Sequence, residues 1–305
     1  MTNGVTGSAI ASGPRTRPHR LQGRIEGPSL RLDRRVHAIR DDLADVFLAG
    51  SVIAPRYVEG VARQGILPTA TMHARPDAAS TVISQLLLGE AFTLFDTAGD
   101  WGWGQCGHDG YVGWTRLAAL GEPLAASHRV AAATAAVFAA PDIKAPLIAT
   151  VPLNALLAAS DAGERFVAAA GGFVHRRHVA GLTDAAADPV AVALGFVGSP
   201  YVWGGRTRQG IDCSGLTQAA LLACGIACPR DSDQQAAAFP AIGAAARRAG
   251  DLVVFPGHVG ILVDPDTILH ANAHWMATVV EPLADAARRL APAGFHRPAA
   301  RARSC

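Results

Sequence analysis

Between Gly65 and Leu120 the apolar residues come in short runs separated by turn-forming residues, and this spacing limits the possible folds more than any other feature of the chain. Runs this short are typical of β-strands and not of the longer helices of an α-helical domain. Gly99-Asp100 and Asp109-Gly110 suit hairpin turns, the second a two-residue loop. The sequence therefore predicts a small antiparallel barrel over residues 65–122.

Aromatic residues gather in the second half of this predicted barrel. We expect them on neighbouring strands, and they are Trp101, Trp103, Tyr111 and Trp114. They either fill the core of the barrel, or Tyr111 stands at the edge of a binding groove. Both interpretations stay open at this point.

The segments on either side of this barrel differ from it in their sequence pattern. Residues 1–28 are rich in Gly, Ser, Thr, Pro and Arg without periodicity, which predicts a mobile leader. Within residues 29–64, apolar residues at helical spacing predict an amphipathic helix from Asp33 to Leu48, with Asp33 as its N-cap. Residues 123–184 repeat the strand pattern more weakly and predict a second, degraded barrel. A polar break before Pro189 separates it from a last domain over residues 185–305.

Size and composition fit a globular protein of two or three domains. The chain has 305 residues, half of them apolar and 17% charged. A net charge of +2 is too small to attract nucleic acid. Arginines gather near both ends, and we interpret them as solvated tails rather than as arms that bind a polyanion.

Neither a secretory signal nor a membrane anchor is visible in the sequence. The first 20 residues hold no basic stretch followed by an apolar run. No window reaches the roughly 18 apolar residues that span a bilayer. We therefore expect a cytoplasmic protein without a membrane partner.

The five cysteines are an odd number, spread unevenly along the chain, which does not suit a disulfide framework. Cys224 and Cys228 are four residues apart in a predicted helix, but no second Cys/His pair follows at zinc-site spacing. We interpret both as buried thiols. The sequence suggests neither a metal site nor an organic cofactor.

One cysteine lies at a position that favours a reactive thiol. After Asp212, apolar residues at helical spacing predict a helix that ends near Gly225, so Cys213 lies at its N-terminus. Free backbone N–H groups and the positive end of the helix dipole are expected to lower the pKa of that thiol. The same N–H groups can stabilise an oxyanion.

Two histidines follow in a segment that predicts neighbouring strands. Pro256-Gly257 interrupts an apolar run, so that His258 opens the second strand, and His270 ends the next one. A thiolate nucleophile needs an imidazole to exchange its proton and a third group to orient that ring. A lone histidine is usually structural, but two strand histidines after a cysteine at a helix start predict a catalytic set.

These motifs resemble a known family. Asp212-Cys213-Ser214-Gly215-Leu216, the preceding Tyr201-Val202-Trp203-Gly204-Gly205, and the later Gly250-Asp251-Leu252 and Gly257-His258-Val259-Gly260 are similar to the NlpC-type cysteine peptidases. The resemblance covers about residues 188 to 296. It implies an α+β protein in which a papain-like catalytic domain follows one or two SH3-like β-barrels.

The resemblance also implies roles for individual residues. Cys213 would be the nucleophile, and its backbone N–H would help to stabilise the oxyanion. His258 would be the general base and acid, and His270 the third member. His274 competes for that third place, but His270 directly follows two apolar strand residues. Tyr201 would direct its hydroxyl at the scissile carbonyl.

One branch of the family cuts the γ-D-glutamyl to diamino acid bond in small peptides with a free N-terminal L-alanine. By the resemblance, Asp212 and Tyr111 would hold the ammonium group, with Ser214 beside them. Ser232 and Arg230 would meet the glutamyl carboxylate, although Arg230 could instead brace its loop through Asp231 or Asp233.

The sequence leaves three functions to weigh. The first is an endopeptidase of murein peptide recycling whose partner is the peptide L-Ala-γ-D-Glu-diamino acid, with diaminopimelate or lysine as the diamino acid. The second is a hydrolase that remodels intact peptidoglycan, and the third is a non-catalytic module that binds wall peptides. The intact set of Cys213, His258 and His270 argues against the third. Papain-like folds also host amidases and acyltransferases, and the residues Asp212, Ser214 and Tyr111 favour an endopeptidase over these.

Overall fold

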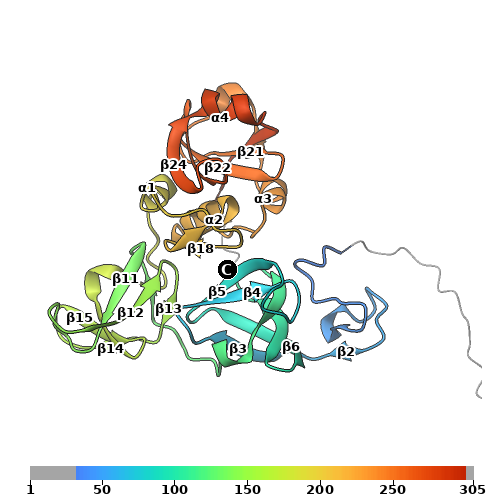
Figure 1. The fold of residues 1–305 in the computed structure, drawn as a ribbon, viewed down its shortest axis with the longest axis vertical. Coiled ribbons are helices and arrows are strands. Elements are labelled where there is room, and N and C mark those ends of the chain that lie inside the picture. The colour runs from blue at the N-terminus through green and yellow to red at the C-terminus, as the bar shows by residue number, and fades with distance from the viewer. Residues whose placement is uncertain (1–31, 300–305) are drawn as a thin grey trace, which may run out of the picture. The chain divides into compact units, whose positions relative to one another are not determined.

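The computed structural model describes residues 32–299, which form mostly β-sheet with a few short helices (Figure 1). The leader predicted over residues 1–28 lies outside them. Within the described part of the chain, no helix is long and apolar enough to cross a membrane. The α+β class predicted from the sequence is confirmed.

The segment before the first large sheet does not form the predicted amphipathic helix. It runs through turns into the two-residue strand β1 (Ala44–Asp45) and the 3-10 helix η1 (Val46–Leu48). Strand β1 pairs in parallel with β2 (Tyr57–Val58). Asp33, the predicted N-cap, instead accepts hydrogen bonds from Arg35.

Contacts with the following sheet explain why this helix is absent. Leu43 is buried beside Trp103 and Trp114, whereas Phe47 from the same apolar set is 87% exposed. The guanidinium of Arg40 lies over the ring of Trp103, 4.7 Å from its centroid. These contacts stabilise an irregular backbone, so tertiary packing overrides a pattern that is locally helical.

The first large sheet has seven antiparallel strands in the order β5-β4-β8-β7-β6-β3-β9. Its core contains Met72, Leu86 and Phe92. The elements are β3 (Val61–Gly65), β4 (Thr69–His73), β5 (Val82–Leu87), β6 (Ala91–Ala98), β7 (Trp101–Cys106), β8 (Val112–Arg116), the 3-10 helix η2 (Leu117–Ala119) and β9 (Leu120–Gly121). The strands predicted for this segment are confirmed.

Of the two predicted hairpin turns in this sheet, one is confirmed. Gly99 and Asp100 alone connect β6 to β7, with Gly99 at a φ of 55°. The second prediction, a two-residue turn at Asp109-Gly110, is wrong because the loop takes up residues 107–111. The side chain of Asp109 is fully buried in that loop, so the loop's packing determines its length.

Residues 128–181 form two smaller sheets, of three and five strands, in the orders β13-β10-β17 and β12-β11-β16-β15-β14. Val137, Val151 and Val174 lie in their shared core. The elements are β10 (His128–Val130), β11 (Thr134–Phe138), β12 (Leu147–Pro152), β13 (Leu156–Leu157), β14 (Ser160–Asp161), β15 (Phe166–Ala169), β16 (Gly172–His175), the 3-10 helix η3 (Arg176–His178) and β17 (Val179–Gly181). The strand content predicted for residues 123–184 is therefore present.

The last part of the chain has a six-stranded sheet in the order β20-β25-β21-β22-β23-β24. Helices α1 (Pro189–Leu194), α2 (Cys213–Ala223) and α3 (Ser232–Ala238) precede its longer strands, and α4 (Leu283–Arg289) follows them. The remaining elements are β18 (Arg206–Thr207), β19 (Gly210–Ile211), β20 (Ala241–Ile242), the 3-10 helix η4 (Ala244–Ala246), β21 (Leu252–Phe255), β22 (His258–Asp264), β23 (Thr267–Asn272), β24 (Ala277–Pro282) and β25 (Gly294–His296).

Alternate residues of the sheet face two different helices. Ile261 lies in one apolar core with Leu216 of α2, while its neighbour Leu262 lies in another with Leu283 of α4. Successive side chains of a strand point to opposite faces. The sheet is therefore packed between α2 and α4, and the start of α2 lies against the strands that carry the two histidines.

Candidate active site

The helix that begins at Cys213 is fixed by local contacts. The carboxylate of Asp212 caps it and accepts the backbone N–H of Gly215 at 2.7 Å. A Cβ on Gly215 would lie 2.3 Å from the carbonyl oxygen of Gly205, so only glycine permits this approach. The predicted helix start is confirmed, and the thiol of Cys213 is buried, with the residue 7% exposed.

The β21–β22 hairpin brings the two predicted histidines together. Phe255 pairs with His258 across the Pro256-Gly257 turn, and β23 places His270 on the adjacent strand. Nε2 of His258 lies 2.8 Å from Nδ1 of His270. His274, the predicted competitor, lies against the ring of Trp275 instead, with 4.8 Å between centroids.

A carboxylate that the sequence analysis missed continues this chain of contacts. Nε2 of His270 lies 2.7 Å from Oε1 of Glu281 on β24, which also binds the guanidinium of Arg289 on α4. Glu281 pairs with Ile268 in the β23–β24 hairpin, two residues from His270. The register of that hairpin, had it been worked out from the sequence, would have indicated the contact.

Burial dominates the titration of the predicted nucleophile and base. It raises the pKa of Cys213 to about 11, and the charge of Asp212 acts in the same direction, although N–H groups of Val259 and Ser214 lower it. The expected lowering of this pKa is therefore wrong, because desolvation outweighs the helix N-terminus. Burial also lowers the pKa of His258 to about 4, and the charge of His270 adds to this effect. The thiol of Cys213 and the imidazole of His258 are therefore both neutral in the substrate-free site at neutral pH.

Asp212 and Arg230 form a buried ion pair. Nη2 of Arg230 lies 2.6 Å from Oδ2 of Asp212, and Arg230 is 1% exposed. The guanidinium also donates to the hydroxyls of Ser214 at 2.9 Å and Ser84 at 3.1 Å. Arg230 therefore braces the start of α2 through Asp212, and the expected bracing through Asp231 or Asp233 is wrong.

This ion pair also affects the residues predicted to meet the substrate. The Asp212 carboxylate accepts hydrogen bonds from the backbone N–H groups of Gly204 and Gly215 as well as from Arg230. The structure thus pairs Asp212 with Arg230, and Asp212 also lines a hollow together with Cys213.

Tyr111 faces a different carboxylate from the one predicted. Its hydroxyl lies 3.2 and 3.1 Å from the two oxygens of Asp231. Burial raises the pKa of Asp231, while the charge of Arg230 and the hydroxyl of Tyr111 act against this. Tyr111 is itself buried, so it belongs to the packed interior and also points its polar end at the catalytic segment. The acidic residue next to Arg230 and Ser232 was the signal in the sequence.

Two hollows flank the predicted nucleophile and base. One, of about 270 Å³, connects the thiol with the Tyr111 and Asp231 pair and is lined by Tyr111, Trp203, Asp212, Cys213, Ser214, Asp231 and Ser232, among others. The second, of about 330 Å³, lies at His258 and is lined in part by Tyr201, His270, His274 and Arg289. Burial and the charge of Cys213 raise the pKa of Tyr201 to about 12, which keeps its hydroxyl protonated beside the thiol.

Protein-family models match the two regions that the motifs indicated. The model of the NlpC/P60 family matches residues 198–285, and that of the bacterial dipeptidyl-peptidase Sh3 domain matches residues 72–120. Residues 198–285 form an NlpC/P60 domain. The predicted resemblance and fold are confirmed, and the NlpC/P60 match is preceded by the match to the SH3-like domain.

Curated relatives match less than a third of this chain. Dipeptidyl-peptidase 6 of Lysinibacillus sphaericus is 39% identical over 85 residues, which are 27% of this chain and 31% of the relative. Gamma-D-glutamyl-L-lysine dipeptidyl-peptidase of Bacillus subtilis is 35% identical over 94 residues, 28% of this chain and 32% of the relative. These matches span less than a third of each relative's length.

One solved structure is similar in fold to more of the chain than the NlpC/P60 domain. The crystal structure of an NlpC/P60 family protein from Bacillus cereus aligns with a TM-score of 0.69 at 20% identity, over 78% of this chain and 99% of that one. The arrangement of sheets before the NlpC/P60 domain therefore has a counterpart in a related fold.

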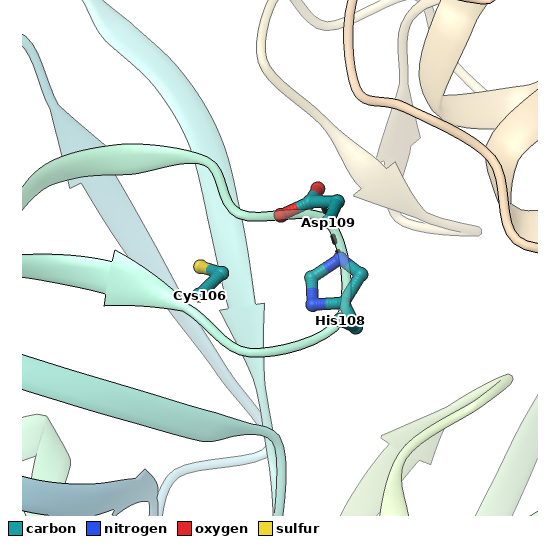
Figure 2. Close-up of side chains that lie close together, drawn as sticks. All are labelled: Cys106, His108 and Asp109. Carbon is teal, nitrogen blue, oxygen red and sulfur yellow. Dashed lines mark ion pairs between the residues drawn. The ribbon is translucent and has the colours of Figure 1, made fainter. Parts of the chain in front are cut away.

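One cluster outside the NlpC/P60 domain has residue types that can bind a metal. Figure 2 shows Cys106, which ends β7, with His108 and Asp109 from the loop that follows, and their ligand atoms lie within 4.8 Å of one another. Nε2 of His108 lies 3.0 Å from Asp109. Burial raises the pKa of Cys106, and the charge of Arg206 acts against this, so a guanidinium already lies near these groups and opposes a cation. We interpret the cluster as part of a polar network with the NlpC/P60 domain, where Asp109 accepts from Gln218 at 2.9 Å.

Proposed function

We propose that the chain is a cysteine peptidase that hydrolyses the γ-D-glutamyl to diamino acid bond of small cell-wall peptides with a free N-terminal L-alanine. Cys213 is the nucleophile, His258 the general base and acid, and His270 the residue that orients His258. The amine of the substrate binds Asp231 and Tyr111, and the diamino acid leaves through the hollow at His258.

The contact between Tyr111 and Asp231 is the observation that carries this proposal. It lies in the same hollow as Cys213, so a substrate whose acyl carbon is at the thiol can extend its amino end to a carboxylate. An ammonium needs an anion in a partly desolvated site. Asp231 is such a group, and the hollow of about 270 Å³ suits a dipeptide rather than a glycan strand.

The contacts of the histidines fit one pair of tautomers. The Glu281 carboxylate can only accept, so His270 carries its proton on Nε2 and leaves Nδ1 bare. Nδ1 of His270 then accepts the Nε2 proton of His258, which leaves Nδ1 of His258 as the free acceptor. This is the tautomer that a general base needs.

The reaction follows from these states. As substrate binds, the thiol proton of Cys213 moves to Nδ1 of His258 and the thiolate attacks the γ-carbonyl carbon. The oxyanion is stabilised by N–H groups at the start of α2 and by the Tyr201 hydroxyl. His258 then protonates the departing amine, and water activated by the same ring hydrolyses the thioester.

A peptide with a free N-terminal alanine is already detached from the glycan. The proposal therefore assigns the enzyme to recycling of released peptides, and with it to the cytoplasm, rather than to remodelling of the intact wall. Fractionation of cells that produce the protein tests the location separately from the activity.

The decisive experiment compares L-Ala-γ-D-Glu-diaminopimelate, its lysine counterpart and the N-acetylated forms of both. Without its positive charge the substrate strands Asp231 in the pocket, at a cost of about 2–5 kcal/mol, so acetylation is expected to lower kcat/KM roughly 30-fold or more. Asp231→Asn is expected to narrow this difference. Equal cleavage of free and acetylated peptides would favour the wall hydrolase.

Cys213→Ala is the control for catalysis itself. We expect this variant to fold and to release no dipeptide, because no other thiol replaces the nucleophile. If peptide binds to the wild type but neither protein cuts it, the chain is a binding module.

A further inference from the structure

We propose that Arg35, from the segment before the first large sheet, is a positioning residue of the amine subsite that holds Asp231 toward the ammonium group of the substrate. This inference rests on the proposed function. Arg35 precedes both matched domains in the sequence, and no motif indicated it.

The guanidinium of Arg35 connects its own segment to the start of helix α3. Nη1 donates to Asp231 and to Asp233, each at 2.9 Å. Nη2 donates to Asp233 and to Asp33, each at 2.8 Å, and Nε donates to Asp33 at 3.1 Å. All the side-chain nitrogens of Arg35 are thus directed at carboxylates, and this planar fork fixes the position of Asp231.

The cluster remains negative after this pairing. Three carboxylates, of Asp33, Asp231 and Asp233, surround one guanidinium, which leaves a formal charge of about −2. A carboxylate can accept up to about four hydrogen bonds, and Tyr111 and Arg35 leave Asp231 capacity for a further donor. Arg35 therefore orients the anion without removing the field that attracts an amine.

The backbone around Arg35 is anchored to β7 and β8, the strands on either side of the loop that carries Tyr111. The carbonyl of Arg35 accepts the N–H of Val112 at 2.7 Å, and the side chain of Gln105 donates to the carbonyl of Val36 at 2.9 Å. The guanidinium thus extends from a fixed point beside Tyr111. The hollow that contains Cys213 includes Arg35 in its lining, so one wall of the amine subsite comes from the N-terminal segment.

The test measures kcat and KM for the free tripeptide and for its N-acetylated form. For Arg35→Ala we expect KM for the free tripeptide to rise roughly tenfold, because a misplaced Asp231 loses part of a charged contact. The value of kcat should stay within about twofold, and kcat/KM for the acetylated peptide should not change, since that substrate has no ammonium. Arg35→Lys keeps the charge but loses the fork, so it should show an intermediate KM.

Arg34→Ala is the matched control. It removes the same charge one position away, where Arg34 binds the exposed Asp41, and it should leave both parameters unchanged. A lowered KM in Arg35→Ala would show that Arg35 competes with the amine, and an unchanged KM would show that it does not position Asp231. Either result overturns the inference.

The failure of this inference is distinct from failure of the proposed function. If the wild type does not distinguish free from acetylated peptide, the amine subsite itself is wrong. If the wild type distinguishes them and Arg35→Ala does so equally, only the role of Arg35 is wrong. Should Arg35→Ala unfold, the KM of Arg35→Lys decides the question in the same way.

Discussion

Among single residues, His270 and His274 compete for the third place in the catalytic set, and their contacts differ. His270 contacts His258 at 2.8 Å, whereas His274 lies edge-on against the ring of Trp275. We expect His258→Ala to abolish turnover, His270→Ala to lower kcat by roughly 10- to 100-fold, and His274→Ala to leave kcat near wild type. Steady-state kinetics on the free tripeptide measure all three. A silent His270→Ala with a damaging His274→Ala would reverse the assignment.

Glu281 gives a prediction on pH. Its charge raises the pKa of His258, against the lowering by burial and by His270. Glu281→Gln removes the charge and keeps an acceptor oxygen, so the pKa of His258 falls and the acid limb of kcat/KM moves to lower pH. The plateau of kcat should fall too, because the imidazolium formed during the reaction loses its partner charge. The pH profile of the variant measures both effects.

If the acid limb of kcat/KM moved to higher pH in Glu281→Gln, this electrostatic role of Glu281 would be wrong. An unchanged profile with lower thermal stability would make Glu281 structural. Asp285→Asn serves as control, since Asp285 binds Arg288 on the exposed face of the same region and should not move the limb.

The residues that the sequence could predict are those with local signals. Cys213 follows an N-cap and precedes a helical pattern, and His258 follows a Pro-Gly turn, so short-range rules located both. Asp231, Glu281 and Arg35 make contacts across the fold, which the short-range rules that located Cys213 and His258 do not encode. Asp212 carries a local signal of another kind, because an Asp directly before a helix is often its N-cap, and its carboxylate accepts the N–H of Gly215.

At the scale of elements, the β22–β23 pair depends on one close approach. A Cβ on Gly260 would lie 2.6 Å from the side chain of Ile268 and 3.1 Å from Cβ of His270. Gly260→Ala should therefore shift His270, cost about 1–3 kcal/mol in the free energy of unfolding, and lower kcat more than it changes KM. Denaturant unfolding and steady-state kinetics test this.

Gly243→Ala, between β20 and η4, is the control for this substitution. No heavy atom lies within 4 Å of a Cβ placed on Gly243, so its stability and kcat should stay near wild type. If Gly260→Ala behaved the same way, the strand pairing would have more freedom than the contacts indicate.

The sequence could predict those elements in which one apolar periodicity or one turn signal was clear. Helix α2 and the β21–β22 hairpin agree with the sequence because their apolar residues are buried on the predicted faces. The segment from Asp33 to Leu48 has equally helical spacing, but of its apolar residues Leu43 packs against tryptophans of the first large sheet while Phe47 is exposed. A periodic pattern cannot distinguish a helix from a segment whose conformation is set by its neighbour.

At the scale of the molecule, the proposed function requires that the NlpC/P60 domain and the sheet that carries Tyr111 keep a fixed relation. Arg206 makes two 2.9 Å hydrogen bonds to Glu90, and both side chains are buried. Nε of Arg206 donates to Gln218 at 3.0 Å, and Gln218 in turn donates to Asp109. This network connects α2 with the loop that presents Tyr111.

The last prediction concerns the removal of one charged side chain from this network. Arg206→Met leaves the Glu90 carboxylate buried without its cation, which should cost about 3–5 kcal/mol in the free energy of unfolding. Because Tyr111 and Asp231 come from the two sides of the network, the variant should also lose part of its preference for the free over the acetylated tripeptide, while cleavage of the acetylated peptide persists. The double variant Glu90→Gln with Arg206→Met removes both charges and should recover stability relative to the single one. If selectivity stays at the wild-type level while stability falls, the network supports the fold but does not align the amine subsite with Cys213.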